Sequence, residues 1–170
     1  MFKKAMTCAI MLCSMLLIAA CGASIEKEQS KAVEQAEKAF DKEPEEANQE
    51  IQSIAFYLPS GMSVKDDKPN NIILDKQDHP YILFYNPNEE EDSQALYNLL
   101  IDTDDPLIIN QTFTKDDRFG YLVITEIEEE ETYEVTAGIG GTKATTESAV
   151  QNVSEDAKLL MDIVRSSQVE

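Results

Sequence analysis

Cys21 is the residue whose type and position point most clearly to chemistry. The chain has 170 residues and three cysteines, the other two being Cys8 and Cys13. Cys21 directly follows an apolar run, residues 5–20, that contains both of the others. A cysteine sulfur is a nucleophile, so a thiol at a fixed boundary of this kind can accept a covalent group.

The first 20 residues have the three parts of an export signal. Lys3 and Lys4 supply the positive charge, residues 5–20 form the apolar segment, and Ala19 and Ala20 are the small residues before a cleavage site. A helix of 16 residues spans about 24 Å, which is less than the roughly 30 Å hydrocarbon core of a bilayer. A cleaved signal therefore fits better than a membrane-spanning anchor.

The run Leu17-Ile18-Ala19-Ala20-Cys21 resembles the lipobox of bacterial lipoproteins, with Ile18 at the usual leucine position. The resemblance implies cleavage between Ala20 and Cys21 and an S-diacylglycerol group on the Cys21 sulfur. It also implies optional acylation, for example by palmitate, of the new amine. Two or three acyl chains hold a protein stably where one chain is reversible. The expected location is the extracytoplasmic face of the cell membrane; an ordinary secretory signal is the alternative.

Removal of residues 1–20 would leave Cys21 as the only cysteine. With its sulfur committed to lipid, the chain would have no thiol for redox chemistry, nucleophilic catalysis or metal binding. Small exported domains often depend on disulfides. We therefore expect this one to be held by a hydrophobic core.

His79 is the only histidine and the first candidate for a metal ligand. Asp75 or Asp78 could complete a site with it. One histidine without cysteine partners argues against structural zinc, and the simpler interpretation is an exposed turn residue. We predict no metal site and no cofactor.

Two acidic clusters could bind calcium: Asp102, Asp104 and Asp105, and Asp116 with Asp117. An EF-hand loop needs glycine at its sixth position and glutamate at its twelfth. Counted from Asp102, these positions hold Leu107 and Phe113, so the motif is absent. A looser calcium site remains an alternative to solvated turns.

No catalytic constellation is recognisable. Glu126, Glu128 and Glu130 would share a face of an extended strand, and paired carboxylates can hydrolyse glycosides, but acidic residues are frequent here. Residues 138–143 have the glycines of a phosphate loop without its Gly-Lys-Ser/Thr core. We predict no catalytic residues, and keep a small carboxylate-dependent hydrolase as an alternative.

The composition is strongly acidic, with 14 basic and 33 acidic residues and a net charge of −19. Such a surface repels nucleic acid and anionic lipid headgroups. We therefore expect no nucleic-acid partner, contact with the membrane through the lipid anchor, and an unidentified protein partner at the cell surface.

The chain is expected to have three parts: a cleaved signal peptide (residues 1–20), a lipid anchor with a helical spacer or tether (21–50) and one globular domain (51–170). The spacer would contain a helix over residues 24–42, whose apolar stripe is thin and mostly alanine. Pro44 ends it and could start a short further turn over residues 45–51.

Hydrophobic patterns predict the elements of the domain. The expected strands are residues 54–58, 72–74, 81–85, 107–114, 119–127, 132–140 and a short 142–146; the expected helices are residues 89–101 and 154–166. The predicted fold is α+β, an antiparallel sheet of five to six strands packed against helices.

The strands contain several tyrosines, namely Tyr57, Tyr81, Tyr85, Tyr121 and Tyr133. Alternate ones should be buried, and those on the second face could line a ligand or partner surface, since an antiparallel sheet often leaves one face open.

The segment Phe56-Tyr-Leu-Pro-Ser-Gly61, the central meander and the terminal Ile163-Val-Arg-Ser166 resemble small exported domains of the PsbP-like α+β type. Many uncharacterised lipoproteins of Gram-positive bacteria look similar. The resemblance covers most of residues 54–166 and implies a binding or assembly role more often than catalysis. A shared fold transfers no function by itself.

The sequence therefore predicts a membrane-anchored lipoprotein that acts as a non-enzymatic binding or interaction module. A cation- or small-ligand-binding lipoprotein is the alternative besides the hydrolase.

Overall fold

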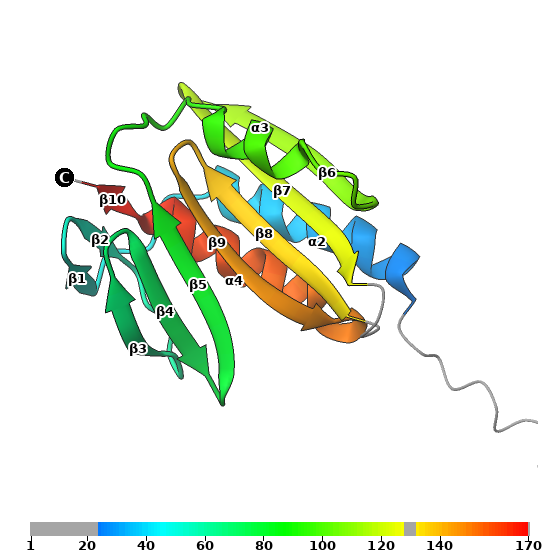
Figure 1. Ribbon diagram of the computed structural model, residues 1–170, viewed down its shortest axis with the longest axis horizontal. Coiled ribbons are helices and arrows are strands. Elements are labelled where there is room, and N and C mark those ends of the chain that lie inside the picture. The colour runs from blue at the N-terminus through cyan, green and yellow to red at the C-terminus, as the bar shows by residue number, and fades with distance from the viewer. Residues whose placement is uncertain (1–23, 128–131, 170) are drawn as a thin grey trace, which may run out of the picture.

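The computed structural model describes residues 24–127 and 132–169 (Figure 1). The signal segment, Cys21, Glu128 and Glu130 lie outside the described residues. Three α-helices are present in the described part: α2 (Ile25–Asp41), α3 (Ala95–Ile101) and α4 (Val153–Ser166), the last preceded by the 3₁₀ turn η2 (Val150–Asn152). The strands are β1 (Gln49–Ile51), β2 (Ile54–Phe56), β3 (Ser63–Lys68), β4 (Asn71–Lys76), β5 (His79–Tyr85), β6 (Leu107–Lys115), β7 (Arg118–Ile127), β8 (Thr132–Ile139), β9 (Thr142–Ala149) and β10 (Gln168–Val169).

The main sheet is antiparallel and has seven strands in the order β3-β4-β5-β9-β8-β7-β6. The predicted α+β class with an antiparallel sheet is confirmed, and the strand count is higher than the expected five to six. β1, β2 and β10 form a separate small sheet. The turn expected over residues 45–51 is wrong, because its end is strand β1.

The additional strand of the main sheet is β3, which has the polar sequence Ser-Val-Lys-Asp-Asp-Lys. It lies at an edge of the sheet, and its register with β4 shifts between Val64 and Asp66. Charged residues and a bulge are common on edge strands because they discourage pairing with other chains. A strand of this kind has no apolar alternation from which to predict it.

Helices α2 and α4 lie side by side on one face of the sheet (Figure 1). Ser154 near the start of α4 donates to Glu28 near the start of α2 over 2.6 Å. Arg165 near the end of α4 donates from Nε to the Phe40 carbonyl near the end of α2 over 3.1 Å. The two helices therefore run in the same direction.

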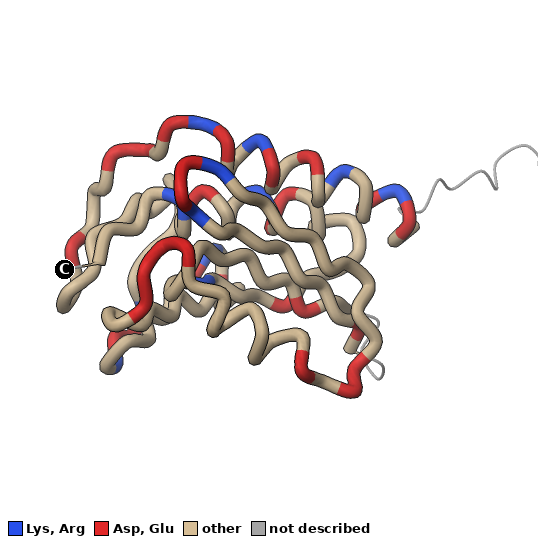
Figure 2. The backbone as a smooth tube through the Cα atoms, turned by 90° about the horizontal axis from the view of Figure 1, so that it is seen from above, with Lys and Arg blue, Asp and Glu red and all other residues tan. Residues whose placement is uncertain are grey.

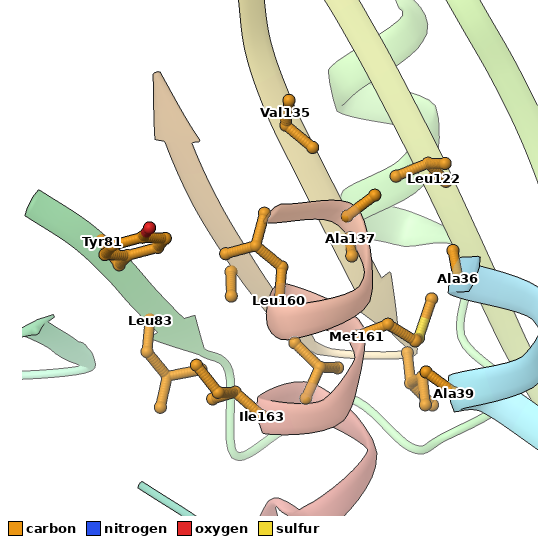
Figure 3. Packing of buried hydrophobic residues seen from close by; sticks show 14 of the residues in the cluster. Ala36, Ala39, Tyr81, Leu83, Leu122, Val135, Ala137, Leu160, Met161 and Ile163 are labelled. Carbon is orange, nitrogen blue, oxygen red and sulfur yellow. The ribbon is translucent and has the colours of Figure 1, made fainter. Parts of the chain in front are cut away.

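The hydrophobic core lies between these helices and the inner face of the sheet. In Figure 3, Leu160 and Ile163 of α4 point toward Ala137 on β8 and Leu83 on β5, while Met161 points toward Ala36 and Ala39 of α2. These side chains are all buried. The predicted helix over residues 154–166 is confirmed, one residue longer at its start.

The helix predicted over residues 24–42 exists, but it is not a solvated spacer. Ala32, Ala36, Ala39 and Phe40 are buried. Alanine faces allow close approach of α2 to α4, and the Phe40 ring lies over Gly120, where a Cβ would come within 2.6 Å of it. The thin alanine stripe is thus the packing surface, and α2 belongs to the layered domain.

Helix α3 lies on the opposite, outer face of the sheet (Figure 1). The helix predicted over residues 89–101 is wrong in its first half, because only Ala95–Ile101 is helical. The backbone of the preceding loop bonds elsewhere: the Glu91 carbonyl accepts from Phe119 N–H over 2.9 Å. Among the described helices, none is long and apolar enough to cross a membrane.

Candidate binding groove

The outer face of β5 carries apolar side chains. Tyr81, Leu83 and Tyr85 point into the core, so the alternation of a strand directs Ile82 and Phe84 to the other side. Ile82 is 45% exposed and Phe84 is half-buried. This part of the sheet therefore presents apolar surface away from the two long helices.

Tyr97 holds helix α3 against the same face. Its hydroxyl donates to Asn110 Oδ1 over 3.0 Å. Its ring centroid lies 5.3 Å from that of Phe119 and 5.6 Å from that of Tyr121. No residue of α3 is fully buried, and Leu99 is 73% exposed. Tyr97 thus supplies the aromatic contacts of α3 with the sheet, while the leucines of α3 remain partly or fully exposed to solvent.

A groove runs between α3 and the sheet and encloses about 510 Å³. Its lining is Asn71, Ile82, Phe84, Leu96, Leu99, Leu100, Glu134, Lys143 and Thr145. Clusters of exposed apolar side chains with a polar rim are typical of ligand or partner sites. The groove can thus bind apolar groups.

One end of the groove is acidic. Glu134 also lines a second hollow of about 450 Å³, together with Asp104, Asp105 and Glu126. Glu134 faces Glu147 across the β8–β9 pair, so no cross-strand cation neutralises it there. Acidic positions gather at turns and strand ends, while the middle strands carry few charges (Figure 2). A ligand that extends from the groove into this hollow would meet negative charge.

The tyrosines lie differently from the expected open-face arrangement. Tyr81 and Tyr85 are buried on the inner face, as alternation predicts. Tyr121 points to the outer face, but it is fully buried near Tyr97 and lines no open surface. Tyr57 follows the end of β2 and is outside any strand. The exposed apolar surface on the outer face is instead formed by aliphatic side chains together with Phe84.

His79 lies at the start of β5 and is half-buried. Its Nε2 lies 2.9 Å from Thr146 Oγ1, and its ring packs edge-on to Tyr81. Asp75, the partner considered for it, forms an ion pair with Lys65. The histidine is therefore a packed residue of the sheet.

A polar hollow of about 330 Å³ next to His79 contains Ser148 and Asp156. These residues do not form a Ser-His-Asp relay, because the Ser148 hydroxyl donates directly to Asp156 over 2.7 Å. Tyr81 donates to the other Asp156 oxygen over 2.9 Å. Burial, and then the Asp156 charge, raise the pKa of Tyr81. The three groups satisfy one another and link β5 and β9 to α4.

The acidic candidates of the sequence remain apart from one another. Asp102, Asp104 and Asp105 are exposed after α3, and Asp116 and Asp117 form the β6–β7 turn with positive φ angles of 49° and 59°. Within residues 24–127 and 132–169, no group of three or more His, Cys, Asp or Glu side chains could hold a metal ion. The glycines of residues 138–143 are at the β8–β9 hairpin, where Asn86 N–H donates to the Gly141 carbonyl.

No protein-family model and no curated protein matches the chain. The structure is similar to the solution structure of cyanobacterial PsbP (CyanoP) from Synechocystis sp. PCC 6803. The two are 12% identical, with a TM-score of 0.44, and the match covers 69% of this chain and 87% of that one. At this TM-score the match carries no argument about this chain.

The groove was not predicted from the sequence. Leu96, Leu99 and Leu100 form an apolar stripe, and such a stripe predicts a buried helix face rather than an exposed groove wall. The run Tyr81-Ile-Leu-Phe-Tyr85 did contain a signal, since it is apolar on both faces. A strand that is apolar on both faces is suited to packing against other groups on both sides of the sheet.

Proposed function

We propose that this protein is an extracytoplasmic lipoprotein, anchored through Cys21, and that its domain is a non-enzymatic module that binds a protein partner in the groove under α3. The observation that carries the binding role is the exposure of aliphatic side chains on both walls, Leu99 at 73% and Ile82 at 45%. Removing such groups from water on binding is favourable by about 25 cal/mol per Å².

The proposed occupant is a polypeptide segment with apolar side chains followed by lysine or arginine. The apolar part matches the walls formed by Leu96, Leu100 and Phe84. The basic part matches the adjoining hollow, where Glu134, Glu126 and the Asp104–Asp105 pair supply negative charge. Charge complementarity of this kind speeds association and fixes the orientation of the partner.

The binding role is tested by Leu99→Ser with Leu96→Ser, which reduce the apolar wall without entering the core. We expect loss of partner recovery after crosslinking in intact cells. Val64→Ser is a matched control, since Val64 is half-buried on β3 and absent from the groove lining. Equal partner recovery by the double variant and the wild type would contradict the proposal.

The anchor is tested separately by Cys21→Ala. We expect loss of labelling by a palmitate analogue and release from the membrane fraction, or accumulation of uncleaved chain. Retention at the membrane of a cleaved variant without lipid label would exclude lipid anchoring through Cys21, and would leave the groove test unaffected.

A further inference from the structure

The fold brings the only two arginines of the sequence, Arg118 and Arg165, to one cleft. Arg118 is the first residue of β7, and Arg165 lies in the last turn of α4. The cleft has a volume of about 270 Å³ and is completed by residues 89–91, the β8–β9 turn and residues 167–169. It shares no lining residue with the groove under α3.

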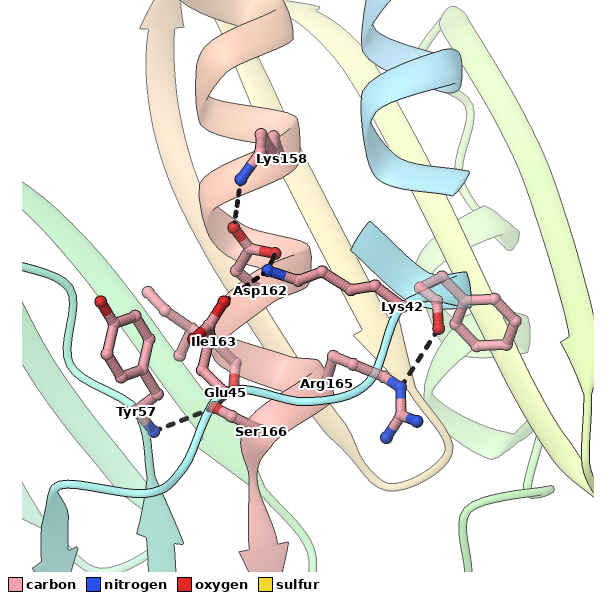
Figure 4. A network of polar contacts seen from close by, with 9 residues as sticks. Lys42, Glu45, Tyr57, Lys158, Asp162, Ile163, Arg165 and Ser166 are labelled. Atoms are coloured by element: carbon pink, nitrogen blue, oxygen red, sulfur yellow. Dashed lines mark hydrogen bonds and ion pairs between the residues drawn. The ribbon is translucent and has the colours of Figure 1, made fainter. Parts of the chain in front are cut away.

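Arg165 is held at one atom and free at the others. Its Nε donates to the Phe40 carbonyl, and Figure 4 shows its two terminal nitrogens directed away from that bond. Within the described residues, these nitrogens have no hydrogen-bond or ion-pair partner. Burial, and then the Arg118 charge, lower the pKa of Arg165, while the charges of Glu91, Glu43 and Asp116 act in the opposite direction. An arginine fixed at Nε presents the terminal pair of donors that bind a carboxylate in bidentate fashion.

Arg118 shows that a carboxylate fits this cleft. Its Nε donates to Glu91 Oε2 over 2.9 Å. Arg118 is only 19% exposed at its side chain, whereas Glu91 is 62% exposed. Because Glu91 is mostly exposed, its carboxylate can leave the pair and remain hydrated while a ligand carboxylate takes its place.

The wall beside Arg118 is closely packed. A Cβ on Gly140 would come 2.2 Å from the Glu90 carbonyl oxygen and 2.6 Å from Glu91 Cα. The β8–β9 turn thus supports the backbone of residues 89–91 directly. The Ser93 hydroxyl donates a hydrogen bond to the Glu89 carboxylate. This bond keeps the Glu89 side chain against its own loop.

We propose that this cleft is a second binding site, and that it binds a carboxylate group of an external ligand between Arg118 and Arg165 in place of the Glu91 side chain. The ligand class is a compact organic acid or an acidic peptide side chain. In a chain with net charge −19, the two guanidinium groups offset part of the negative charge that Glu89, Glu90 and Glu91 bring to the cleft.

The test is NMR of the ¹⁵N-labelled full chain, because two arginines give only two Nε–Hε signals. The probes are sodium succinate, inorganic phosphate, and sodium chloride at matched ionic strength. We expect both signals to shift in a saturable manner with succinate, and not with chloride. Glu91→Gln should tighten succinate binding several-fold, because it removes the competing internal carboxylate.

Arg165→Gln should abolish the shift of the Arg118 signal, and Lys68→Gln, on the distant strand β3, should leave it unchanged. If Arg165→Gln does not fold, Arg165→Lys keeps the charge without the fork and should weaken binding about tenfold. The absence of a saturable shift in the folded wild type would overturn the proposal. Phosphate binding as tight as succinate binding would overturn the carboxylate assignment.

Discussion

Tyr121 on β7 lies directly over Gly138 on the paired strand β8. A Cβ on Gly138 would come 2.1 Å from Tyr121 Cζ and 2.3 Å from its hydroxyl oxygen. The ring can lie flat on the sheet only because position 138 has no side chain, and Tyr97 of α3 then packs on Tyr121. This pair supports the helix that forms one wall of the groove.

Gly138→Ala should therefore destabilise the domain and loosen α3. The tyrosine ring cannot stay in place, and overpacking of this kind costs about 1–3 kcal/mol. Thermal unfolding measures the stability, and limited proteolysis near residues 95–101 measures the loosening. Unchanged stability and protease resistance would show that Tyr121 does not support α3.

Tyr121→Phe should stabilise the domain, in contrast to Gly138→Ala. The Tyr121 hydroxyl is buried and has no hydrogen-bond partner in the described part of the chain. A buried unsatisfied polar group costs about 1–3 kcal/mol, so its removal should raise the free energy of unfolding by up to about 1 kcal/mol. Burial raises the pKa of Tyr121. Its neutral form is thus favoured by folding, and this contribution is lost as pH rises above 10, so Tyr121→Phe should also unfold less readily in alkali.

Phe40→Ala tests whether α2 belongs to the domain. Phe40 is buried over Gly120 and stacks on Phe113 at 5.6 Å. Its truncation should cost about 3–5 kcal/mol, as for other buried phenylalanines. A spacer helix would tolerate the change, so an unaltered denaturant midpoint would restore the spacer interpretation.

The Glu28 carboxylate makes the free energy of unfolding depend on pH in the acid range. Its buried carboxylate accepts from Lys31 and Ser154, and these bonds, the Lys31 bond first, lower its pKa from the ordinary value of 4.5. A lowered pKa in the folded state stabilises the protein above pH 4.5, and this contribution is lost as pH falls further. Glu28→Gln should reduce stability at pH 7 by about 1–2 kcal/mol and flatten the acid limb of the stability curve. A parallel acid limb in the variant would contradict this role.

The packed position of α2 also changes the expected geometry at the membrane. If Cys21 carries lipid as proposed, three residues reach at most about 11 Å from the anchor to Ser24, while α2 extends about 26 Å. A fluorophore at Ser30 should then be quenched by labelled lipid headgroups more strongly than one at Glu43, beyond the other end of α2. Equal quenching at both sites would contradict this orientation.

The sequence predicted the elements that have a regular apolar pattern. Alternation in residues 132–139 and the stripe of α4 correspond to real elements because each buries one face. Residues 119–127 are apolar on both faces, a pattern that predicts a central strand. β7 is instead next to the edge strand β6, and its two faces are covered by α2 and α3.

The groove could not be predicted because it depends on tertiary placement. Leucines in residues 95–101 indicate a buried face, yet Leu99 is 73% exposed. Only the crossing of α3 over β7 and the outward side of Ile82 create the site. The two arginines, 47 residues apart, give no local signal either.

Site-specific photocrosslinking at position 99 in intact cells tests the binding role of the groove most directly. A photoreactive phenylalanine at Leu99 should capture a defined protein partner, and the crosslink should disappear when Ile82 on the opposite wall is changed to Asp. The same group at Lys38, an exposed position on α2 across the sheet, should capture nothing comparable. Absence of a crosslink at position 99, or identical crosslinks at both positions, would contradict a binding role for the groove.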